Sequence, residues 1–132
     1  MDIKLYNQKD LEKMRPACAI AAATLDYITD FIKPGISTLE LDDLCHKFME
    51  KQGAYPAPLT KGFPKSTCIS VNHVVCHGIP SKKLLKNGDI VNIDVSLEFN
   101  GWFGDNSRMF FVGEVSIKAK RLVQITYDSM MA

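Results

Sequence analysis

The sequence has no long apolar run, no marked excess of charge of either sign and no signal segment at its start. Its 132 residues include 16 Lys and Arg against 15 Asp and Glu, a net charge of +1. Such a balance gives no electrostatic reason to bind nucleic acid or a membrane surface. No stretch approaches the roughly 18 apolar residues that a membrane-spanning helix needs, and the opening residues lack an apolar secretion signal. We therefore expect a cytoplasmic chain that binds neither a membrane nor nucleic acid directly.

Cysteine is sparse as well, and its spacing is uninformative. The four cysteines have no C-x-x-C spacing and form no paired framework. In a chain without a secretion signal, this pattern favours reduced thiols over disulfides. Hydrophobic residues make up 46% of the chain and charged residues 23%, which is ordinary for a globular protein. The length predicts one domain over residues 1–132.

The first predicted helix begins after Asn7, which can cap it, with Asp10 at the third helical position. Pro16 removes one backbone hydrogen bond and is expected to kink this helix. The sequence Lys33-Pro34-Gly35 is expected to end it. The apolar stripe that should face the core comprises Leu11, Met14, Cys18, Ala22, Leu25 and Ile32.

Two further helices are predicted. Ser37 and Glu40 have the spacing of a capping box for the second helix, and Gly53 is expected to close it. Ser116 opens a last, amphipathic helix over residues 117–131. The core stripe expected for the second helix comprises Leu41, Leu44, Cys45 and Phe48.

Between the helices the pattern indicates loops and short strands. Residues 55–65 are rich in glycine and proline and are predicted to form a loop. Residues 67–71 and 74–77 are predicted to form short strands flanking a turn. Helices beside a small antiparallel sheet place the chain in the α/β (α+β) class, with two packing helices and a further C-terminal helix.

The clearest local signal is a β-hairpin. Residues 90–99 alternate, with apolar side chains at odd positions, which is typical of a strand with one buried face. Asn100-Gly101 is the strongest short signal for a two-residue type I′ turn. The return strand covers residues 102–112. With a two-residue loop, Phe99 faces Trp102.

The same register brings two aspartates together. Ser96 faces Asp105 and Asp94 faces Ser107, so the two aspartates are diagonal neighbours on one face, with Cα atoms roughly 7–8 Å apart. Two carboxylates at that separation can share divalent cations, and a cation would make their like charges tolerable. Alternatively, both are polar strand residues facing water. Asp94 favours the first reading, because Asp is disfavoured in the middle of a strand.

Several motifs closely resemble the first half of type I bacterial methionine aminopeptidases. The likeness runs from about Leu11 to the last residue, in order and without a large gap. The motifs are Pro64-Lys65-Ser66-Thr67-Cys68-Ile69-Ser70-Val71-Asn72, Cys76-His77-Gly78-Ile79-Pro80, Asn87-Gly88-Asp89-Ile90-Val91-Asn92-Ile93-Asp94, Gly101-Trp102-Phe103-Gly104-Asp105 and Ser107-Arg108-Met109-Phe110.

The resemblance implies a pita-bread fold that holds two divalent metal ions (Co, Mn, Fe, Zn or Ni). By resemblance Asp105 bridges both ions and Asp94 chelates one. Three further ligands, including the general base, come from a C-terminal half that this sequence lacks. The chain also ends at Ala132 without a helix stop signal. We therefore expect an amino-terminal half that is inactive alone, exposes an apolar seam and binds metal weakly. Carbonyls around Asn72 and Val74 resemble a monovalent-cation site.

The resemblance also implies substrate-binding residues. His77 matches a catalytic histidine that hydrogen-bonds near the scissile peptide and steadies the tetrahedral intermediate, a task that suits an imidazole. Phe63, Cys68 and Trp102 match a pocket for the methionine thioether. Phe63 and Trp102 are equally compatible with simple core packing. The other two histidines lack such context and are expected to be structural or exposed.

The function that follows is removal of initiator methionine from nascent polypeptide N-termini, near the ribosome. A proline-specific peptidase of the same fold is a second reading, although such relatives carry a sizeable preceding domain and the first helix here begins close to Met1. A third reading is a catalytically inactive member of the fold that acts as a binding module.

Overall fold

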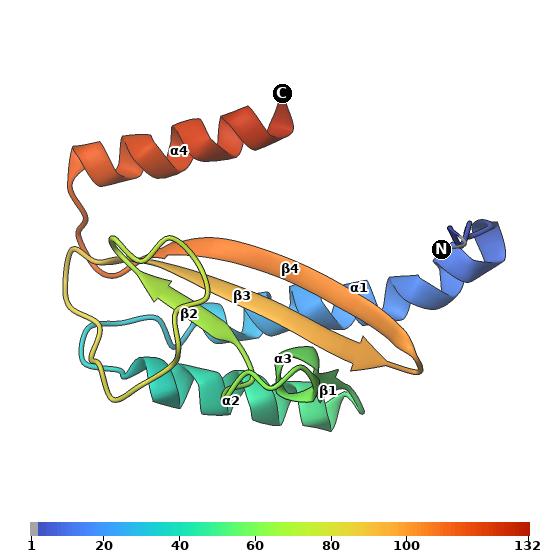
Figure 1. Ribbon diagram of the computed structural model, residues 1–132. Coiled ribbons are helices and arrows are strands. Elements are labelled where there is room, and N and C mark those ends of the chain that lie inside the picture. The colour runs from blue at the N-terminus through green and yellow to red at the C-terminus, as the bar shows by residue number, and fades with distance from the viewer. Residues whose placement is uncertain (1–2) are drawn as a thin grey trace.

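The computed structural model describes residues 3–132 and consists of an antiparallel sheet with two long helices packed along one face (Figure 1). This is the mixed α and β architecture that the sequence predicts. Along the chain the elements are α1 (Gln8–Thr29), α2 (Thr38–Lys51), β1 (Tyr55–Pro56), α3 (Ala57–Thr60), β2 (Cys68–Val71), β3 (Ile90–Phe99), β4 (Trp102–Phe111) and α4 (Ile117–Met131).

Strand β3 is the centre of the sheet. It pairs with β4 along one edge, while β2 and β1 share its other edge. All three pairings are antiparallel. Four alternate residues of β3 are fully buried against α1 and α2, which confirms the predicted period of two: Val91, Ile93, Val95 and Leu97.

The hairpin of β3 and β4 has the predicted register. Phe99 pairs with Trp102, the two residues that flank the turn. Asn100 and Gly101 have φ angles of 52° and 79°, as a type I′ turn requires. The turn therefore fixes which residues face one another along the whole length of both strands.

All three predicted helix starts are confirmed, including Ser116 as the N-cap of α4. The Asn7 side chain accepts a hydrogen bond from the Asp10 amide, and Asp10 accepts one from the Asn7 amide. Ser37 and Glu40 form the same reciprocal capping box at the start of α2. Helix α1 continues as a single element across Pro16. These ends are set by local side-chain hydrogen bonds, which explains why the sequence predicts them.

The face of α1 that enters the core differs from the predicted stripe. Only Leu25 of that stripe is fully buried, whereas Leu11 and Cys18 are exposed. Strand β4 approaches the helix so closely that a Cβ on Gly104 would lie 2.2 Å from the Ala17 carbonyl oxygen. Small side chains permit this approach, so the tertiary contact selects the alanine-rich face. The buried residues of α1 are Ala17, Ala21, Thr24, Leu25 and Ile28.

Two other local predictions are wrong. Residues 55–65 contain the short strand β1 and the helical turn α3 rather than loop alone. Residues 74–77 form no strand. Asn72 and His77 both have positive φ angles, 55° and 54°, and this left-handed conformation is incompatible with an extended strand.

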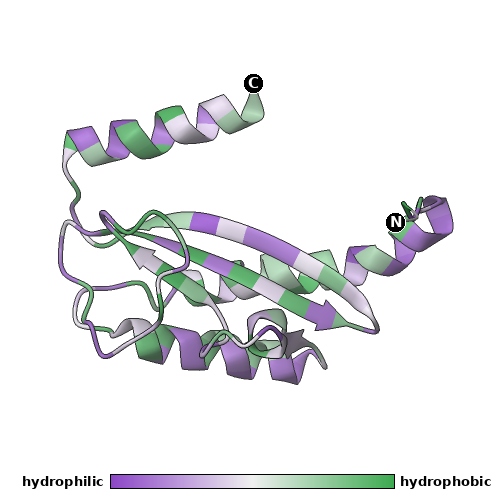
Figure 2. Ribbon diagram, in the orientation of Figure 1, coloured by the Kyte–Doolittle hydropathy of each residue, from purple (hydrophilic) through white to green (hydrophobic). Residues whose placement is uncertain are grey.

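Helix α4 stands apart from the sheet in Figure 1, and none of its residues is buried. Figure 2 shows hydrophobic residues interspersed along it. Ile117 is 85% exposed and Leu122 60% exposed. Helix α4 therefore exposes apolar side chains, and that they form the seam expected from the sequence stays a prediction. In residues 3–132 no helix has the length and apolar character needed to cross a membrane.

Candidate metal centre

The two aspartates lie on the face of the sheet opposite the α1–α2 core. Asp94 pairs with Ser107, and Ser96 pairs with Asp105, so the predicted diagonal arrangement is present. Asp94 is half-buried and Asp105 is exposed. The Ser96 hydroxyl donates a hydrogen bond to Asp105 Oδ1 at 3.0 Å. The hairpin thus places both carboxylates together at a rigid position in the middle of two strands.

The electrostatics of the pair are those of two acids forced close together. Burial raises the pKa of the Asp94 carboxyl, and the neighbouring Asp105 carboxylate raises it further. His77 partly offsets this rise in the pKa of Asp94. A divalent cation would relieve the repulsion between the two carboxylates more effectively than a proton, because it can bind oxygens of both Asp94 and Asp105 at once.

The pair fits a cation but is incomplete as a ligand set. Carboxylate oxygens suit hard divalent ions. Among residues 3–132, however, no group of three or more His, Cys, Asp and Glu side chains is arranged to hold a metal ion. Asp94 and Asp105 would therefore hold one side of the ion and leave most donor positions to water or to groups outside these residues.

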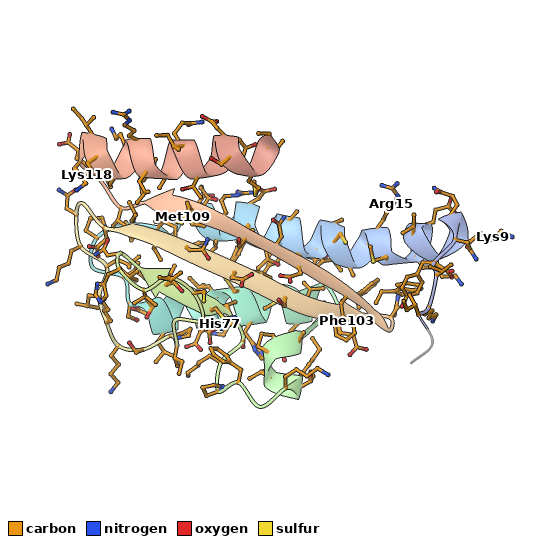
Figure 3. The ribbon with its side chains drawn as sticks, turned by 45° about the horizontal axis from the view of Figure 1, so that its top comes forward. Lys9, Arg15, His77, Phe103, Met109 and Lys118 are labelled. Carbon is orange, nitrogen blue, oxygen red and sulfur yellow. The ribbon has the colours of Figure 1, made fainter. Side chains whose placement is uncertain are left out.

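His77 is held in place by the segment that follows it. Gly78 lies against β2, where its carbonyl accepts a hydrogen bond from the Ile69 amide at 2.8 Å. Its own amide donates to Ser70 Oγ at 3.1 Å. A Cβ on Gly78 would lie only 2.2 Å from the Ile69 carbonyl oxygen. The close approach therefore requires glycine, and it fixes His77 beside the sheet (Figure 3) in a strained conformation of the kind that clusters at functional sites.

Cys68 is the pocket residue that the structure brings to the carboxylates. It pairs with Asp94 across β2 and β3. Burial, and then the negative charge of Asp94, raise the pKa of the Cys68 thiol to about 11. The thiol is therefore protonated at neutral pH and presents a neutral, polarisable surface beside the acids.

Trp102 lies on the other face of the sheet from the carboxylates. Trp102 is three residues from Asp105 in β4, so its side chain lies on the opposite face of the sheet. There it packs against the core and against the Tyr6 ring, with centroids 5.4 Å apart. This position fits the core-packing alternative for Trp102. Phe63 is half-buried in the segment before β2.

A buried acid that the sequence analysis missed anchors the start of β2. Asp42 of α2 is 3% exposed, and its Oδ1 accepts hydrogen bonds from both the amide and the hydroxyl of Thr67, at 2.8 and 2.7 Å. Cys68 follows directly, so this anchor sets where the strand enters the site. The signal was available: Asp42 precedes the buried Cys45 and Met49 by three and seven residues, a helical core spacing.

The other two histidines lie away from the aspartates. His46 contacts Ser66 Oγ through Nδ1 at 2.6 Å and Glu50 through Nε2 at 3.3 Å. His73 is exposed in the turn after β2. Neither the contacts of His46 nor the position of His73 links them to the carboxylate pair.

Comparison with known proteins identifies close relatives. A sequence model of metallopeptidase family M24 matches residues 12–132. The methionine aminopeptidase of Rickettsia prowazekii is 61% identical over 132 residues, which are 99% of this chain and 51% of that protein. The methionine aminopeptidase of Escherichia coli K12 is 50% identical, over 98% of this chain and 50% of that protein. The chain thus spans about half the length of the curated relatives it matches.

Comparison with solved structures agrees with the sequence comparison. The crystal structure of the Rickettsia prowazekii methionine aminopeptidase superposes with a TM-score of 0.96 at 60% identity, over 98% of this chain and 53% of that one. This match confirms the fold that the resemblance implied, that of half a pita-bread aminopeptidase.

Proposed function

Because the chain belongs to metallopeptidase family M24, we propose that it provides part of the active site of a methionine aminopeptidase, which removes the initiator methionine from nascent proteins. The observation that carries this proposal is the Asp94–Asp105 pair on one face of the β3–β4 hairpin. The substrates would be polypeptide N-termini emerging near the ribosome in the cytoplasm.

In this proposal Asp94 and Asp105 are the residues of this chain that would hold two divalent ions. Bound metal would supply a Lewis acid for the scissile carbonyl and lower the pKa of a bound water. His77 donates a hydrogen bond toward the oxygen on which negative charge develops. Cys68, kept neutral by burial, offers an apolar and polarisable surface to the methionine thioether.

Turnover by the 132-residue chain alone is expected to be small. Divalent ions such as Mn²⁺ take about six donors, and Asp94 and Asp105 supply only part of such a set. The resemblance assigns three further ligands, one of which is the general base, to a C-terminal half. Carbonyls near Asn72 would, by the same resemblance, hold a monovalent cation.

The test is metal-dependent release of free methionine from a Met-Ala-Ser peptide. The chain is compared alone and fused to the carboxy-terminal half of the Rickettsia prowazekii relative, with Mn²⁺, Co²⁺ or Fe²⁺ added. We expect release only from the fusion, and loss of release in the Asp105→Ala and Asp94→Ala fusions. The matched control is Ser107→Ala, on the same face of β4, which should release methionine at the parental rate.

Two results would contradict the proposal. A folded fusion that binds metal but releases no methionine would leave the inactive binding module as the better reading. Release that survives Asp105→Ala would mean that the carboxylate pair is not the metal site.

A further inference from the structure

We infer that Ser96 is a positioning residue, whose hydroxyl holds the Asp105 carboxylate in the orientation that binds metal. The inference rests on the proposed function, because it assumes that Asp105 is a ligand. Ser96 pairs directly with Asp105 across the hairpin, and its Oγ lies 3.0 Å from Asp105 Oδ1.

The fold holds Ser96 in a fixed position, whereas the Asp105 side chain is exposed and lies outside the core. Ser96 lies between the fully buried Val95 and Leu97 on the central strand of the sheet, so its Cβ is held by the core. Asp105 is exposed on β4, and an exposed side chain samples several rotamers. The hydrogen bond from the Ser96 hydroxyl therefore selects one rotamer of Asp105.

No Lys or Arg side chain forms an ion pair with Asp105 in the described part of the chain. The ion pairs between described residues join His46 to Glu50 and Arg108 to Asp26, and neither includes Asp105. Among residues 3–132, the Ser96 hydroxyl is the side-chain group that hydrogen-bonds to Asp105, and Asp94 is the neighbouring acid on the same face of the hairpin. The orientation of Asp105 toward a ligand is thus set by the serine and by the neighbouring acid.

The hydrogen bond is compatible with metal binding. An ionised carboxylate offers about four lone-pair positions on its two oxygens. One hydroxyl donor to Asp105 Oδ1 occupies one position and leaves the rest for cations. Groups that orient a metal ligand in this way typically account for 10–100-fold in metal affinity, so deletion of the hydroxyl should be measurable in binding.

The experiment measures Mn²⁺ binding to the 132-residue chain by water-proton relaxation enhancement, which needs no catalytic activity. We expect Ser96→Ala to weaken Mn²⁺ binding by about tenfold, and Ser96→Thr, which retains the hydroxyl, to restore it. Ser107→Ala is the matched control, because Ser107 faces Asp94 on the same side of the hairpin and has no side-chain hydrogen bond among the described residues. The melting temperatures of these chains should coincide.

The outcomes separate the inference from the proposed function. Unchanged Mn²⁺ affinity in Ser96→Ala, with binding abolished in Asp105→Ala, would overturn the role of the serine and leave the metal site standing. Equal weakening by Ser96→Ala and Ser107→Ala would also overturn it. If Asp105→Ala binds Mn²⁺ like the parent chain, or the fusion to the carboxy-terminal half binds none at millimolar concentration, the proposed site itself is wrong.

Discussion

Substituting Gly104 by alanine should destabilise the fold and disturb the site at once, because Gly104 precedes Asp105 and lies against α1. An added Cβ would be 2.2 Å from the Ala17 carbonyl oxygen, 2.4 Å from its carbonyl carbon and 2.8 Å from the Cys18 amide nitrogen. Real Cβ atoms almost never come within 3.0 Å, so β4 and α1 would have to separate by roughly 0.8 Å there.

The loss in free energy of unfolding caused by Gly104→Ala should lie in the range known for overpacked cores, about 1–3 kcal/mol. The atoms that Gly104→Ala would meet belong to the helix backbone and cannot rotate away, so we expect the upper end, about 3 kcal/mol. For a domain of this size 1 kcal/mol corresponds to roughly 4 °C in melting temperature. The melting temperature should therefore fall by about 12 °C.

Thermal and urea unfolding followed by circular dichroism measure this directly. Asn106→Ala, two residues along β4 and exposed, is the matched control and should stay within about 0.5 kcal/mol of the parent. Adding Ala17→Gly should not rescue Gly104→Ala, because the clash involves the Ala17 backbone and not its methyl group. A loss below about 1 kcal/mol in Gly104→Ala, or rescue by Ala17→Gly, would refute the reasoning.

Three other substitutions test separate contacts. Gly78→Ala would bring a Cβ to 2.2 Å from the Ile69 carbonyl oxygen and displace the adjacent histidine; in the active fusion, methionine release should fall more than tenfold at unchanged Mn²⁺ affinity, and an unaltered rate would disprove the positioning. Thr67→Val removes a hydroxyl donor from the buried Asp42 and should cost about 1–3 kcal/mol in urea unfolding; no loss would mean that the anchor is dispensable. The raised pKa of Asp94 means that the folded chain holds this proton more tightly than the unfolded chain, so its stabilising effect is full below the ordinary value near 3.8 and is lost as pH rises through the raised value. Metal-free Asp94→Asn should lack this loss and melt above the parent at pH 7, and equal melting temperatures at every pH would contradict it.

The hairpin and the helix starts could be predicted because their causes are local. The alternation of β3 and the Asn100-Gly101 turn determine the register, and the register alone places Asp94 beside Asp105. The same parity places Trp102 on the opposite face from Asp105, so the sequence already contained the reason to exclude Trp102 from the site.

The position of His77 could not be predicted in this way. Residues 74–77 have the composition of a strand, yet the chain turns through two left-handed residues and docks Gly78 on β2. That docking depends on space beside Ile69, a residue from a strand that precedes the turn. Local propensity carries no information about such space.

The sequence by itself thus determined the chemistry and its spacing: two carboxylates on one face, a histidine before a glycine, and helix caps at Asn7 and Ser37. Only the tertiary structure decided which face of α1 is buried and how the segment of His77 and Gly78 docks on β2. The physical reason is that backbone turns and caps depend on neighbours in the chain, whereas close packing at Gly104 and Gly78 depends on atoms from distant segments.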